Sequence, residues 1–280
     1  MNIVILAAGM GKRMNSDLPK VLHPLAGKSL LGHVVDTART LDPQRLVVVY
    51  GHGGEQVQAA FAGQTDVQWA LQSPQLGTGH AVAQAVPMLV DDVPTLILYG
   101  DVPLVKASTL QRLAEAAQGG KLALLSQHVA DPTGYGRVVR EDDGPDSPVS
   151  AIVEQRDAGP EQRAITEINA GVYVFDAAHL RRALTTLGTD NDQGEVYLTD
   201  VVAHARAEGL SASALVAADH WLVEGCNDRS QLAELGAELN RRTLARWMEA
   251  GVGVVDPAGT WVDMSVELAR DVVLEPGALP

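Results

Sequence analysis

Cysteine is almost absent from this chain of 280 residues, and no apolar run is long enough to cross a membrane. The single cysteine, Cys226, cannot form a disulfide within the chain, and we expect it to be a small buried side chain. The eight histidines are scattered, without the cysteine-backed pairs that indicate a metal site. The N-terminal MNIVILAAG has no basic segment before its apolar run, so it predicts no targeting leader. These absences favour a cytoplasmic protein without a membrane partner.

Basic residues are also few. The chain has 21 Lys and Arg against 35 Asp and Glu, which gives a formal net charge of −14. Such a surface repels the phosphates of DNA and RNA, so no nucleic-acid partner is expected. A small phosphorylated ligand remains compatible with this charge, because a few clustered cations can make a local positive pocket.

Apolar residues, by contrast, make up 46% of the chain, which is ample for a packed core. In the first half, short β-branched runs alternate with helical stretches, and this alternation predicts a doubly wound, mostly parallel α/β sheet. The expected strands are Asn2 to Leu6, Arg45 to Tyr50, Val67 to Leu71, Thr95 to Tyr99 and Leu122 to Gln127. The expected helices are Ser29 to Leu41, Glu55 to Ala62, Gly79 to Val86 and Ser108 to Ala117.

The rhythm changes after residue 130. Further strands are expected at Arg137 to Arg140, Val149 to Glu154 and Asn169 to Phe175, joined by polar connections. We interpret these strands as an antiparallel extension that packs beside the main sheet and completes one wall of a cleft. Together with the first half they make one predicted domain, residues 1–227.

Residues 228–250 predict a long linker helix, because large apolar side chains recur near one stripe and Gly251 follows where a C-terminal cap belongs. The stripe consists of Leu232, Leu235, Leu239, Trp247 and Met248. Residues 251–280 carry valines between turn residues and are too short to bury a core of their own. We expect them to be the beginning of a further β element in a truncated chain.

A glycine loop follows the first expected strand. Gly9, Gly11, Arg13 and Lys20 lie within twelve residues of one another. In an open α/β sheet, ligands bind beyond the carboxyl ends of the strands, where small residues let backbone amides approach a phosphate chain. An arginine can hold two phosphate oxygens, and a lysine acts as a point charge. The loop therefore favours phosphate binding, and an ordinary strand-to-helix turn is the alternative.

Two familiar phosphate motifs do not fit this loop. The ATPase motif G-x-x-x-x-G-K-[ST] fails because Leu6 replaces its first glycine and Arg13 replaces its hydroxyl residue. The dinucleotide fingerprint G-x-G-x-x-G would begin at Gly9, but Met14 stands at its third glycine. A nicotinamide oxidoreductase is therefore disfavoured.

The segment Leu6-Ala7-Ala8-Gly9-x-Gly11-x-Arg13-Met14, followed by Leu18-Pro19-Lys20-Val21-Leu22, resembles the signature of the sugar-nucleotide pyrophosphorylases. Further segments narrow the match, in order and in spacing. They are Gln72 and residues 75–81, 99–104, 131–137, 152–154, 167–169, 194–200 and 224–229. Over roughly residues 1–250 they resemble the uridyltransferase half of the bacterial bifunctional N-acetylglucosamine-1-phosphate uridyltransferase/glucosamine-1-phosphate acetyltransferases.

The resemblance implies a magnesium-dependent enzyme that transfers UMP from UTP to N-acetylglucosamine-1-phosphate. It would release pyrophosphate and make UDP-N-acetylglucosamine for peptidoglycan and lipopolysaccharide precursors. The attacking phosphate oxygen is already an anion, so positioning and charge neutralisation are what the protein must supply. In the full-length family a left-handed β-helix follows, carries the acetyltransferase site and forms homotrimers. With only its first strands in residues 251–280, we expect no acetyl transfer by this chain.

The resemblance also implies the site residues. Asp101 and Asn227 would be Mg²⁺ ligands, Arg13 and Lys20 would neutralise the triphosphate and the charge that develops in transfer, and Tyr197 would line the pocket wall. The substrate-binding set is Leu6, Ala7, Ala8, Gly9, Lys20, Gln72, Gly77, Thr78, Tyr99, Gly100, Asp101, Gly136, Glu154, Asn169, Thr199 and Asn227. Within this set uracil would be recognised by Gln72, Gly77 and Thr78. The sugar would be held by Gly136, Glu154, Asn169 and Thr199.

Each assignment has an alternative that the residues leave open. Asp101 is also compatible with the start of a turn before Pro103, and Asn227 with the N-cap of the long helix. Arg13 and Lys20 are compatible with solvated surface cations. The sugar-contacting residues are compatible with satisfied polar side chains of the antiparallel region, and residues 77–79 with a helix-starting turn.

The loop departs from the commonest family form at Met10 and Lys12, where Lys and Thr are expected. This departure argues against a lysine role at position 10 but leaves Arg13 and Lys20 in place. Two rival functions remain at this stage. One is the same reaction with another nucleotide or sugar, such as thymidylyl transfer to glucose-1-phosphate. The other is a module that binds nucleotide sugars without catalysis.

Overall fold

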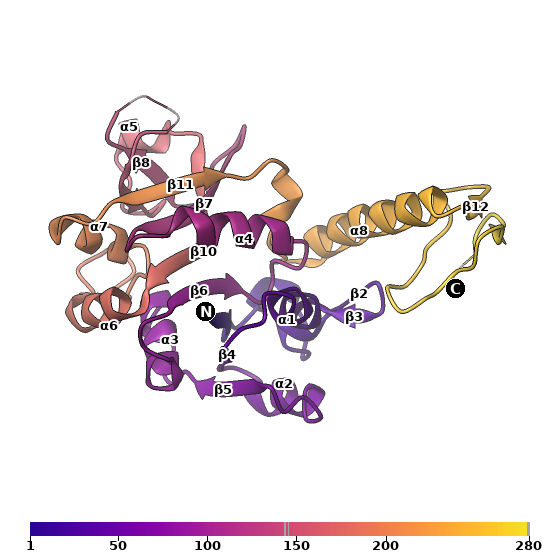
Figure 1. Cartoon of the computed structure of the whole chain (residues 1–280), viewed down its shortest axis with the longest axis horizontal. Helices are drawn as coiled ribbons and strands as arrows, with labels where there is room; N and C mark the ends of the chain where they lie inside the picture. The colour runs from indigo at the N-terminus through magenta and orange to yellow at the C-terminus, as the bar shows by residue number, and fades with distance from the viewer. Residues whose placement is uncertain (143, 145, 279–280) are drawn as a thin grey trace.

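The structure, a computed structural model, describes residues 1–142, 144 and 146–278, so residues 279 and 280 of the expected C-terminal β element lie outside it. Its centre is a mostly parallel sheet with the strand order β11-β7-β10-β6-β1-β4-β5 (Figure 1). These strands are β1 (Asn2–Ala7), β4 (Arg45–Tyr50), β5 (Val67–Leu71), β6 (Pro94–Tyr99), β7 (Leu122–His128), β10 (Glu167–Asp176) and β11 (Ala212–Val216). The predicted doubly wound α/β class is confirmed.

Helices cover both faces of this sheet, because successive side chains of each strand point to opposite faces. Ile3 and Ile5 of β1 pack toward α1 (Leu30–Arg39), α2 (Gly54–Ala60) and α4 (Ala107–Ala116). Val4 and Leu6 pack on the other face toward α3 (Thr78–Ala85), α6 (Ala177–Thr186) and α7 (Asp200–Ala207). The four helices expected in the first half are α1 to α4.

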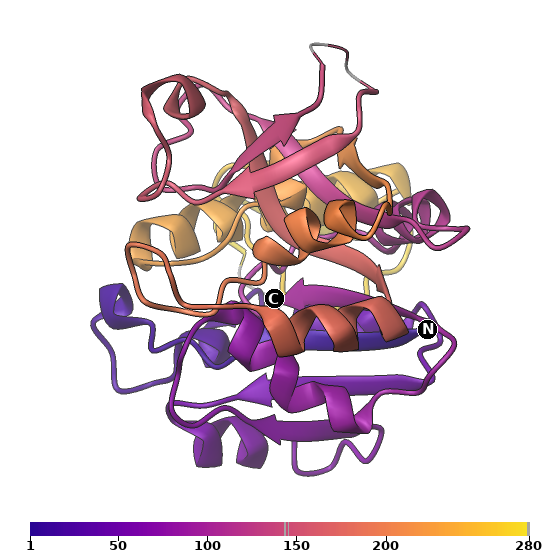
Figure 2. The same cartoon turned by 90° about the vertical axis from the view of Figure 1, so that its left-hand side faces the viewer.

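The predicted antiparallel extension is wrong in one respect. The strand expected at Asn169 to Phe175 is β10, and it lies inside the main sheet, antiparallel to both β6 and β7. Only β8 (Arg137–Arg140) and β9 (Val149–Val153) extend beyond it, through the pairing of β8 with β10. Figure 2 shows this region above the N-terminal strands. The position of a strand in a sheet depends on which strands it pairs with, and these can be far away in sequence. The local pattern of apolar residues does not identify them.

The long helix is α8 (Arg229–Glu249), which extends away from the sheet (Figure 1). Gly251 has a φ of 97°, its N–H donates to Met248 O, and the Val252 N–H donates to Trp247 O. These two bonds are the helix-ending pattern that a left-handed glycine allows. Leu235 and Leu239 of the apolar stripe are buried, whereas Met248 is 42% exposed. Leu244 and Trp247 of the same helix end pack against apolar neighbours, so Met248 is exposed because of the side of the helix on which it lies.

Short elements complete the chain. They are β2 (Pro24–Leu25), β3 (Lys28–Ser29), α5 (Pro160–Arg163), β12 (Gly253–Val254) and β13 (Val273–Leu274), with 3₁₀ turns η1 (Lys12–Met14), η2 (Lys20–Leu22), η3 (Val86–Met88) and η4 (His220–Leu222). β12 and β13 pair in parallel over two residues each. That pairing does not establish a β-helix, which stays a prediction. Within the described ranges, no helix combines the length and apolar character needed to span a bilayer.

Candidate functional site

A cavity of about 490 Å³ opens at the carboxyl ends of β1 and β6. The strand order reverses here, since β4 and β5 lie on one side of β1 and β6 on the other. Such switch points are where open α/β sheets bind ligands. Most of the predicted substrate-binding residues line this cavity: Leu6, Ala7, Ala8, Gly9, Lys20, Gln72, Gly77, Thr78, Tyr99, Asp101, Gly136, Glu154, Asn169 and Asn227.

Lys20 lies at the centre of the predicted metal and phosphate groups. Its ammonium pairs with the Asp101 carboxylate, and the side chains are 13% and 14% exposed. The same Nζ donates to Asn227 Oδ1 at 3.4 Å, across 207 residues of sequence. Lys20 is therefore a paired and largely buried cation, and the alternative of a solvated surface lysine is wrong.

Asn227 is not the N-cap of the long helix α8, the alternative left open by the sequence. The N-cap of α8 is Asp228, whose carboxylate accepts from the Gln231 N–H at 2.9 Å. The backbone N–H of Asn227 donates to Gln231 Oε1 at 2.7 Å, which fixes the residue while its side-chain amide points to Lys20. A local cap thus aims Asn227 at the cavity.

The glycine loop is folded tightly around Lys20. Gly11 has a φ of 58°, and a Cβ there would come within 2.6 Å of Lys20 Cβ, so glycine is required. Gly9 differs, because a Cβ at this position would meet nothing within 4 Å. Gln75 holds the loop from the opposite side by donating to the Ala8 carbonyl. Gly9 therefore presents open backbone to the cavity, whereas Gly11 serves the packing of the loop.

The predicted uracil-binding segment joins the two halves of the molecule. Gly77 is the N-cap of α3, and a Cβ on it would lie 2.5 Å from Val196 O. The Gly79 N–H donates to the same carbonyl at 2.8 Å, and Thr78 Oγ1 accepts from the Leu198 N–H at 3.1 Å. The helix-starting turn and the lining of the cavity are thus two roles of one segment.

The predicted sugar side gathers Glu154, Asn169 and Thr199. Thr199 Oγ1 donates to Glu154 Oε1 at 3.2 Å, so Thr199 lies behind the cavity wall and contacts the ligand space through Glu154. Burial raises the pKa of Glu154, and the Thr199 hydrogen bond opposes this shift. The Asn169 amide donates to the Tyr173 hydroxyl at 2.6 Å and accepts from the Gly171 N–H at 3.1 Å. Asn169 is therefore already held in place before any ligand binds.

Besides Thr199, three predicted residues lie outside the cavity lining. Gly100 sits between Tyr99 and Asp101 and donates its N–H to Leu6 O at 2.9 Å, which sets the spacing of the two strand ends. Arg13 is exposed on η1, although its charge lowers the pKa of Tyr135 against the larger effect of burial. Tyr197 does not line the wall as expected, because it is buried and its hydroxyl accepts from Gln193.

The sequence assigned no role to several lining residues: Val21, Gln75, Ala81, Val102, Gly134, Tyr135, Ala170, Gly171, Glu195, Val223 and Gly225. Gly171 is the most informative of them. Its φ is 74°, and a Cβ would lie 2.6 Å from the Tyr99 ring. It lies where the pairing of β10 with β7 shifts register. A glycine within an expected strand was the available signal, since it indicates a bulge or a close approach.

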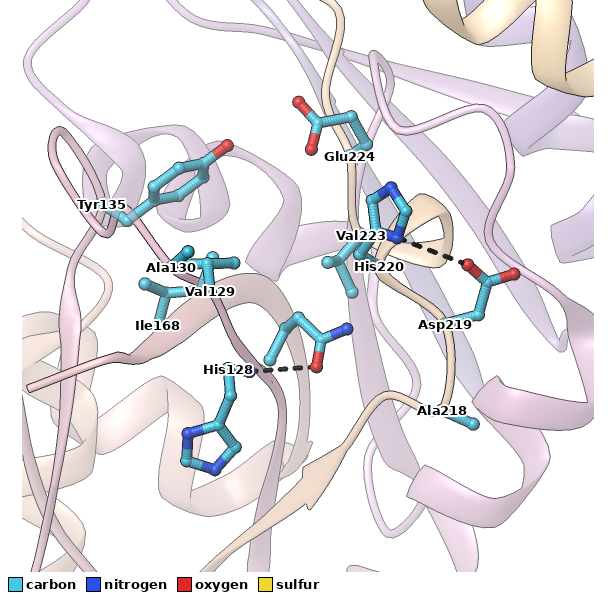
Figure 3. Close-up of a pocket in the computed structure, with 11 residues that line it drawn as sticks. His128, Val129, Ala130, Tyr135, Ile168, Ala218, Asp219, His220, Val223 and Glu224 are labelled. Carbon is cyan, nitrogen blue, oxygen red and sulfur yellow. Dashed lines mark hydrogen bonds and ion pairs between the residues drawn. The ribbon is translucent and has the colours of Figure 1, made fainter.

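A second cavity of about 560 Å³ lies on the far side of Tyr135 and Val223, which line both (Figure 3). Its remaining lining includes His128, His220 and Glu224. No predicted site residue is part of its lining. We therefore take the cavity at the switch point as the candidate site.

The residues at this site fit a divalent cation. Asp101 and Asn227 supply oxygen donors, which hard ions such as Mg²⁺ prefer. Both oxygens already converge on one positive group, the Lys20 ammonium. The Asp101 carboxylate and the Asn227 carboxamide are therefore placed to hold a cation together with ligand phosphates.

The comparison with protein families agrees with this geometry. The model of the MobA-like NTP transferase domain matches residues 3–250. The chain belongs to this family. The chain is 52% identical over 279 residues to bifunctional protein GlmU of Janthinobacterium sp. (strain Marseille), an alignment that covers all of this chain and 61% of that relative. It is 54% identical over 275 residues to bifunctional protein GlmU of Burkholderia orbicola (strain MC0-3), covering 98% of this chain and 60% of that relative.

The NTP transferase thus spans about three fifths of the length of the curated relatives that it matches. Its fold is also that of a UDP-glucose pyrophosphorylase solved in complex with UDP-glucose. The two superpose with a TM-score of 0.67 at 16% identity, over 86% of this chain and 98% of that one. At this identity the likeness shows the fold of the NTP transferase and nothing about its substrate.

Proposed function

We propose that this protein is an N-acetylglucosamine-1-phosphate uridyltransferase. The observation that carries the proposal is the cavity at the switch point, where residues from seven separate segments of the predicted set come together. The similarity to proteins named GlmU supports the choice of substrates, UTP and N-acetylglucosamine-1-phosphate. The products would be UDP-N-acetylglucosamine, a cell-wall precursor, and pyrophosphate. Because a nucleoside triphosphate is made in the cytoplasm, we place the reaction there.

The binding roles follow from position. The backbone of Leu6 to Gly9 borders the triphosphate, with Gly9 leaving open space for it. Gln72, Gly77 and Thr78 border the base, and Gln72 is held by its own donation to Gly77 O at 2.9 Å. Glu154, held by Thr199, accepts from sugar hydroxyls on the opposite wall. Both substrates then meet between β1 and β6, which supplies the proximity that an in-line transfer requires.

The chemical step needs charge neutralisation rather than a base. Lys20 and Arg13 are cations on the loop that borders the phosphates, and they lower the repulsion between two anionic substrates. Mg²⁺, when bound by Asp101 and Asn227, supplies the polarisation of the phosphoryl group. The ionised sugar phosphate displaces pyrophosphate from the α-phosphorus, so UMP is transferred without a protein nucleophile.

The test is a coupled assay of pyrophosphate release with UTP, N-acetylglucosamine-1-phosphate and Mg²⁺. We expect turnover that EDTA abolishes and excess Mg²⁺ restores. The same assay with dTTP and with glucose-1-phosphate decides between this reaction and its nearest rival. A protein that binds UDP-N-acetylglucosamine without any turnover would instead be a binding module. The absence of acetyl transfer from acetyl-CoA and the trimer of the longer family members stay predictions.

A further inference from the structure

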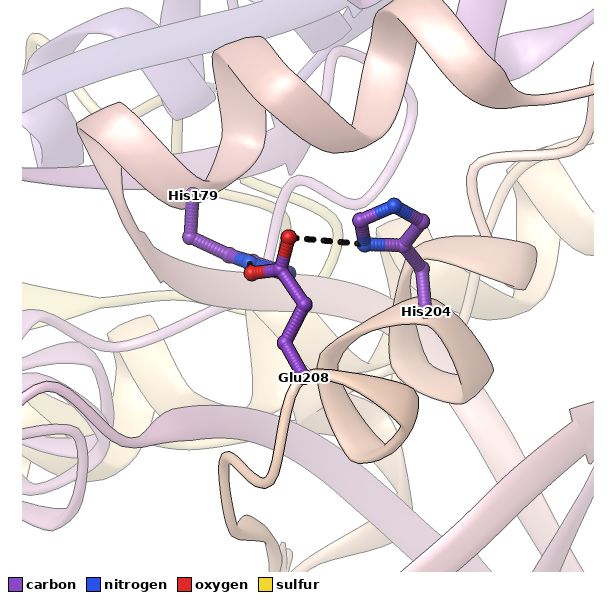
Figure 4. A group of neighbouring side chains, drawn as sticks. All are labelled: His179, His204 and Glu208. Atoms are coloured by element: carbon purple, nitrogen blue, oxygen red, sulfur yellow. Dashed lines mark hydrogen bonds and ion pairs between the residues drawn. The ribbon is translucent and has the colours of Figure 1, made fainter.

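A second group of side chains with metal-binding chemistry lies outside the cavity at the switch point. His179 comes from α6, His204 from α7, and Glu208 from the residue that ends α7 (Figure 4). One ligand atom from each lies within 4.8 Å of the other two. None of the three lines the cavity at the switch point. The proposed transferase reaction therefore leaves this cluster without a role.

The fold fixes the cluster from both sides. Asp176 caps α6 by accepting from the His179 N–H at 2.8 Å, which sets the first turn of that helix. His204 and Glu208 are four residues apart, so they share one face of α7. The rings of His179 and His204 have centroids 5.5 Å apart. Two helices thus present imidazole, imidazole and carboxylate to one point.

Two imidazole nitrogens of the cluster lack protein partners. His179 is 2% exposed, yet its Nε2 is buried without a hydrogen bond, and so is His204 Nδ1. A buried nitrogen of this kind costs free energy unless a partner satisfies it. Of the two, His204 Nδ1 is the free nitrogen beside the Glu208 carboxylate, whereas His179 faces Glu208 with its other nitrogen, Nδ1. Imidazole nitrogens and a carboxylate are the donors that zinc-like ions use.

The spacing also allows one ion to take the place of the hydrogen bond between His179 Nδ1 and Glu208 Oε2. Glu208 Oε1 and His204 Nδ1 are 4.0 Å apart, too far for a hydrogen bond, while Glu208 Oε2 and His179 Nδ1 are 3.0 Å apart. Two ligands of a tetrahedral zinc ion lie about 3.3 Å apart, given bonds of about 2.0 Å. The separations in the cluster lie on either side of that value, so small side-chain rotations bring the ligand atoms to one centre.

The charge at the cluster favours a cation. Glu208 brings a carboxylate, the ligand of the cluster that carries a negative charge, next to both imidazoles. Arg182 donates to Glu208 Oε2 at 3.1 Å, and its side chain is 57% exposed, so it can turn outward to solvent. Glu208 is one-third exposed, which leaves a path for an ion and room for a water ligand.

We propose that His179, His204 and Glu208 form a structural site for a zinc-like transition-metal dication, which would fasten α6 to α7. Mg²⁺ prefers oxygen donors, so this site is distinct in chemistry from the one formed by Asp101 and Asn227. α7 begins beside Thr199, which supports Glu154. An ion here would therefore stiffen the helix behind the sugar-facing wall of the cavity.

The test is equilibrium dialysis of the whole chain against Zn²⁺ with excess Mg²⁺ present, followed by metal analysis. We expect one Zn²⁺ per chain, and an affinity at least about 100-fold lower in His204→Gln and in Glu208→Gln. His52→Gln changes an exposed histidine elsewhere and should bind as the parent does. Co²⁺ in place of Zn²⁺ should give the visible absorption of a four-coordinate ion in the parent and in His52→Gln only.

Arg182→Ala provides a second arm that leaves all three ligands intact. It removes the competing cation, so we expect tighter Zn²⁺ binding. Circular dichroism of each variant checks that the fold is retained. Absence of stoichiometric Zn²⁺ in the parent would overturn the proposal, and so would equal binding by the parent, His204→Gln and Glu208→Gln. A zinc ion that stays bound in these two variants but leaves in Asp101→Asn would place it in the cavity instead.

Discussion

At the scale of single residues, the site depends on groups that hold one another before a ligand arrives. Lys20 joins Asp101, at the end of β6, to Asn227, at the start of α8. The resemblance to pyrophosphorylases predicted that these three residues share a site, and they do lie together. It assigned no role to Gln75 and Gly171. Gln75 holds the glycine loop through the Ala8 carbonyl, and Gly171 leaves room for the Tyr99 ring. Such supporting contacts depend on neighbours that sequence patterns do not identify.

Replacing Asp101 tests the charge at the centre of the site. Asp101→Asn keeps the shape but removes the negative charge that faces Lys20 and the cation. We expect kcat to fall at least about 100-fold, since preorganised charge at a phosphoryl group is usually the largest catalytic effect. Pyrophosphate release under saturating substrates is the measurement. Asp17→Asn, at an exposed position near the same loop, is the matched control and should keep full activity.

The two loop glycines should respond differently to alanine. Gly9→Ala adds a methyl group to open space, so thermal stability should hold while KM for UTP rises about tenfold as the methyl group crowds the phosphates. Gly11→Ala forces a left-handed residue against Lys20 Cβ and should cost about 1–3 kcal/mol of folding free energy. Urea unfolding and UTP titrations of both variants measure this. Equal behaviour of the two would contradict the separation of roles.

At the scale of elements, local patterns predicted the strands and helices of the first half and failed where distant pairing decides. β1, β4 and β6 are apolar on both faces, and each lies between helices as expected. β10 looked like an outlying strand because nothing in its own residues reveals that β6 and β7 flank it. Met248 fits the apolar stripe of α8, yet it is exposed while Trp247, next to it, packs against the apolar cluster that contains Leu244. Periodicity reports the face of an element and not its neighbours.

The middle of α8 should make folding stability depend on pH. Glu238 accepts from Arg241 and Arg242 at 2.6–2.7 Å, and these arginines hold its pKa at about 2, against an ordinary 4.5. A carboxylate whose pKa is lower in the folded than in the unfolded protein stabilises the fold at any pH above its unfolded pKa. This contribution to the free energy of unfolding is lost as the pH falls from about 4.5 toward 2. Glu238→Gln should therefore lose about 2 kcal/mol at pH 7.

That difference should shrink steadily as the pH is lowered. Denaturant unfolding of the parent and of Glu238→Gln at pH 7, 5, 4 and 3 measures it. Glu249→Gln, at an exposed position at the end of the same helix, is the control and should track the parent throughout. A gap between parent and Glu238→Gln that stays constant down to pH 3 would refute the assignment of the stabilisation to this carboxylate.

At the scale of the whole molecule, the chain has more than one core. Two large apolar clusters fill the two faces of the sheet, and a third joins α8 to the loop region through Leu25, Leu30 and Leu235. A fourth, smaller cluster lies at the far end of α8. Its buried members are Leu244, Val252, Val262 and Leu274. Leu244 of α8 thus shares this cluster with the C-terminal segment, which is also bonded to the loop between β2 and β3 through donation of the Met264 N–H to Ala26 O at 3.0 Å.

This separation predicts local unfolding. Leu244→Ala removes a side chain that is 1% exposed. It should lower the free energy of unfolding of the cluster at the far end of α8 by about 2–5 kcal/mol. Amide hydrogen exchange should then speed up in residues 252–274, while β1 and β6 keep the protection of the parent. Leu31→Ala, in the core beneath the sheet, is the comparison and should instead weaken protection of the strands. Faster exchange across the sheet in Leu244→Ala would show that the cores unfold as one.

The backbone bonds that Val196 makes, as acceptor from the Gly79 N–H and as donor to Leu76 O, have a consequence for how the protein can be divided. The connection over residues 189–192 is largely exposed and links α6 to the segment that closes the cavity. A polypeptide ending there and a second one beginning there would still share the pairing of β11 with β7 and the packing of Leu235 against Leu30. The loop with Lys20 would come from one fragment and Asn227 from the other. The connection over residues 189–192 is thus a natural split point, and two separately made pieces would regain activity only by associating.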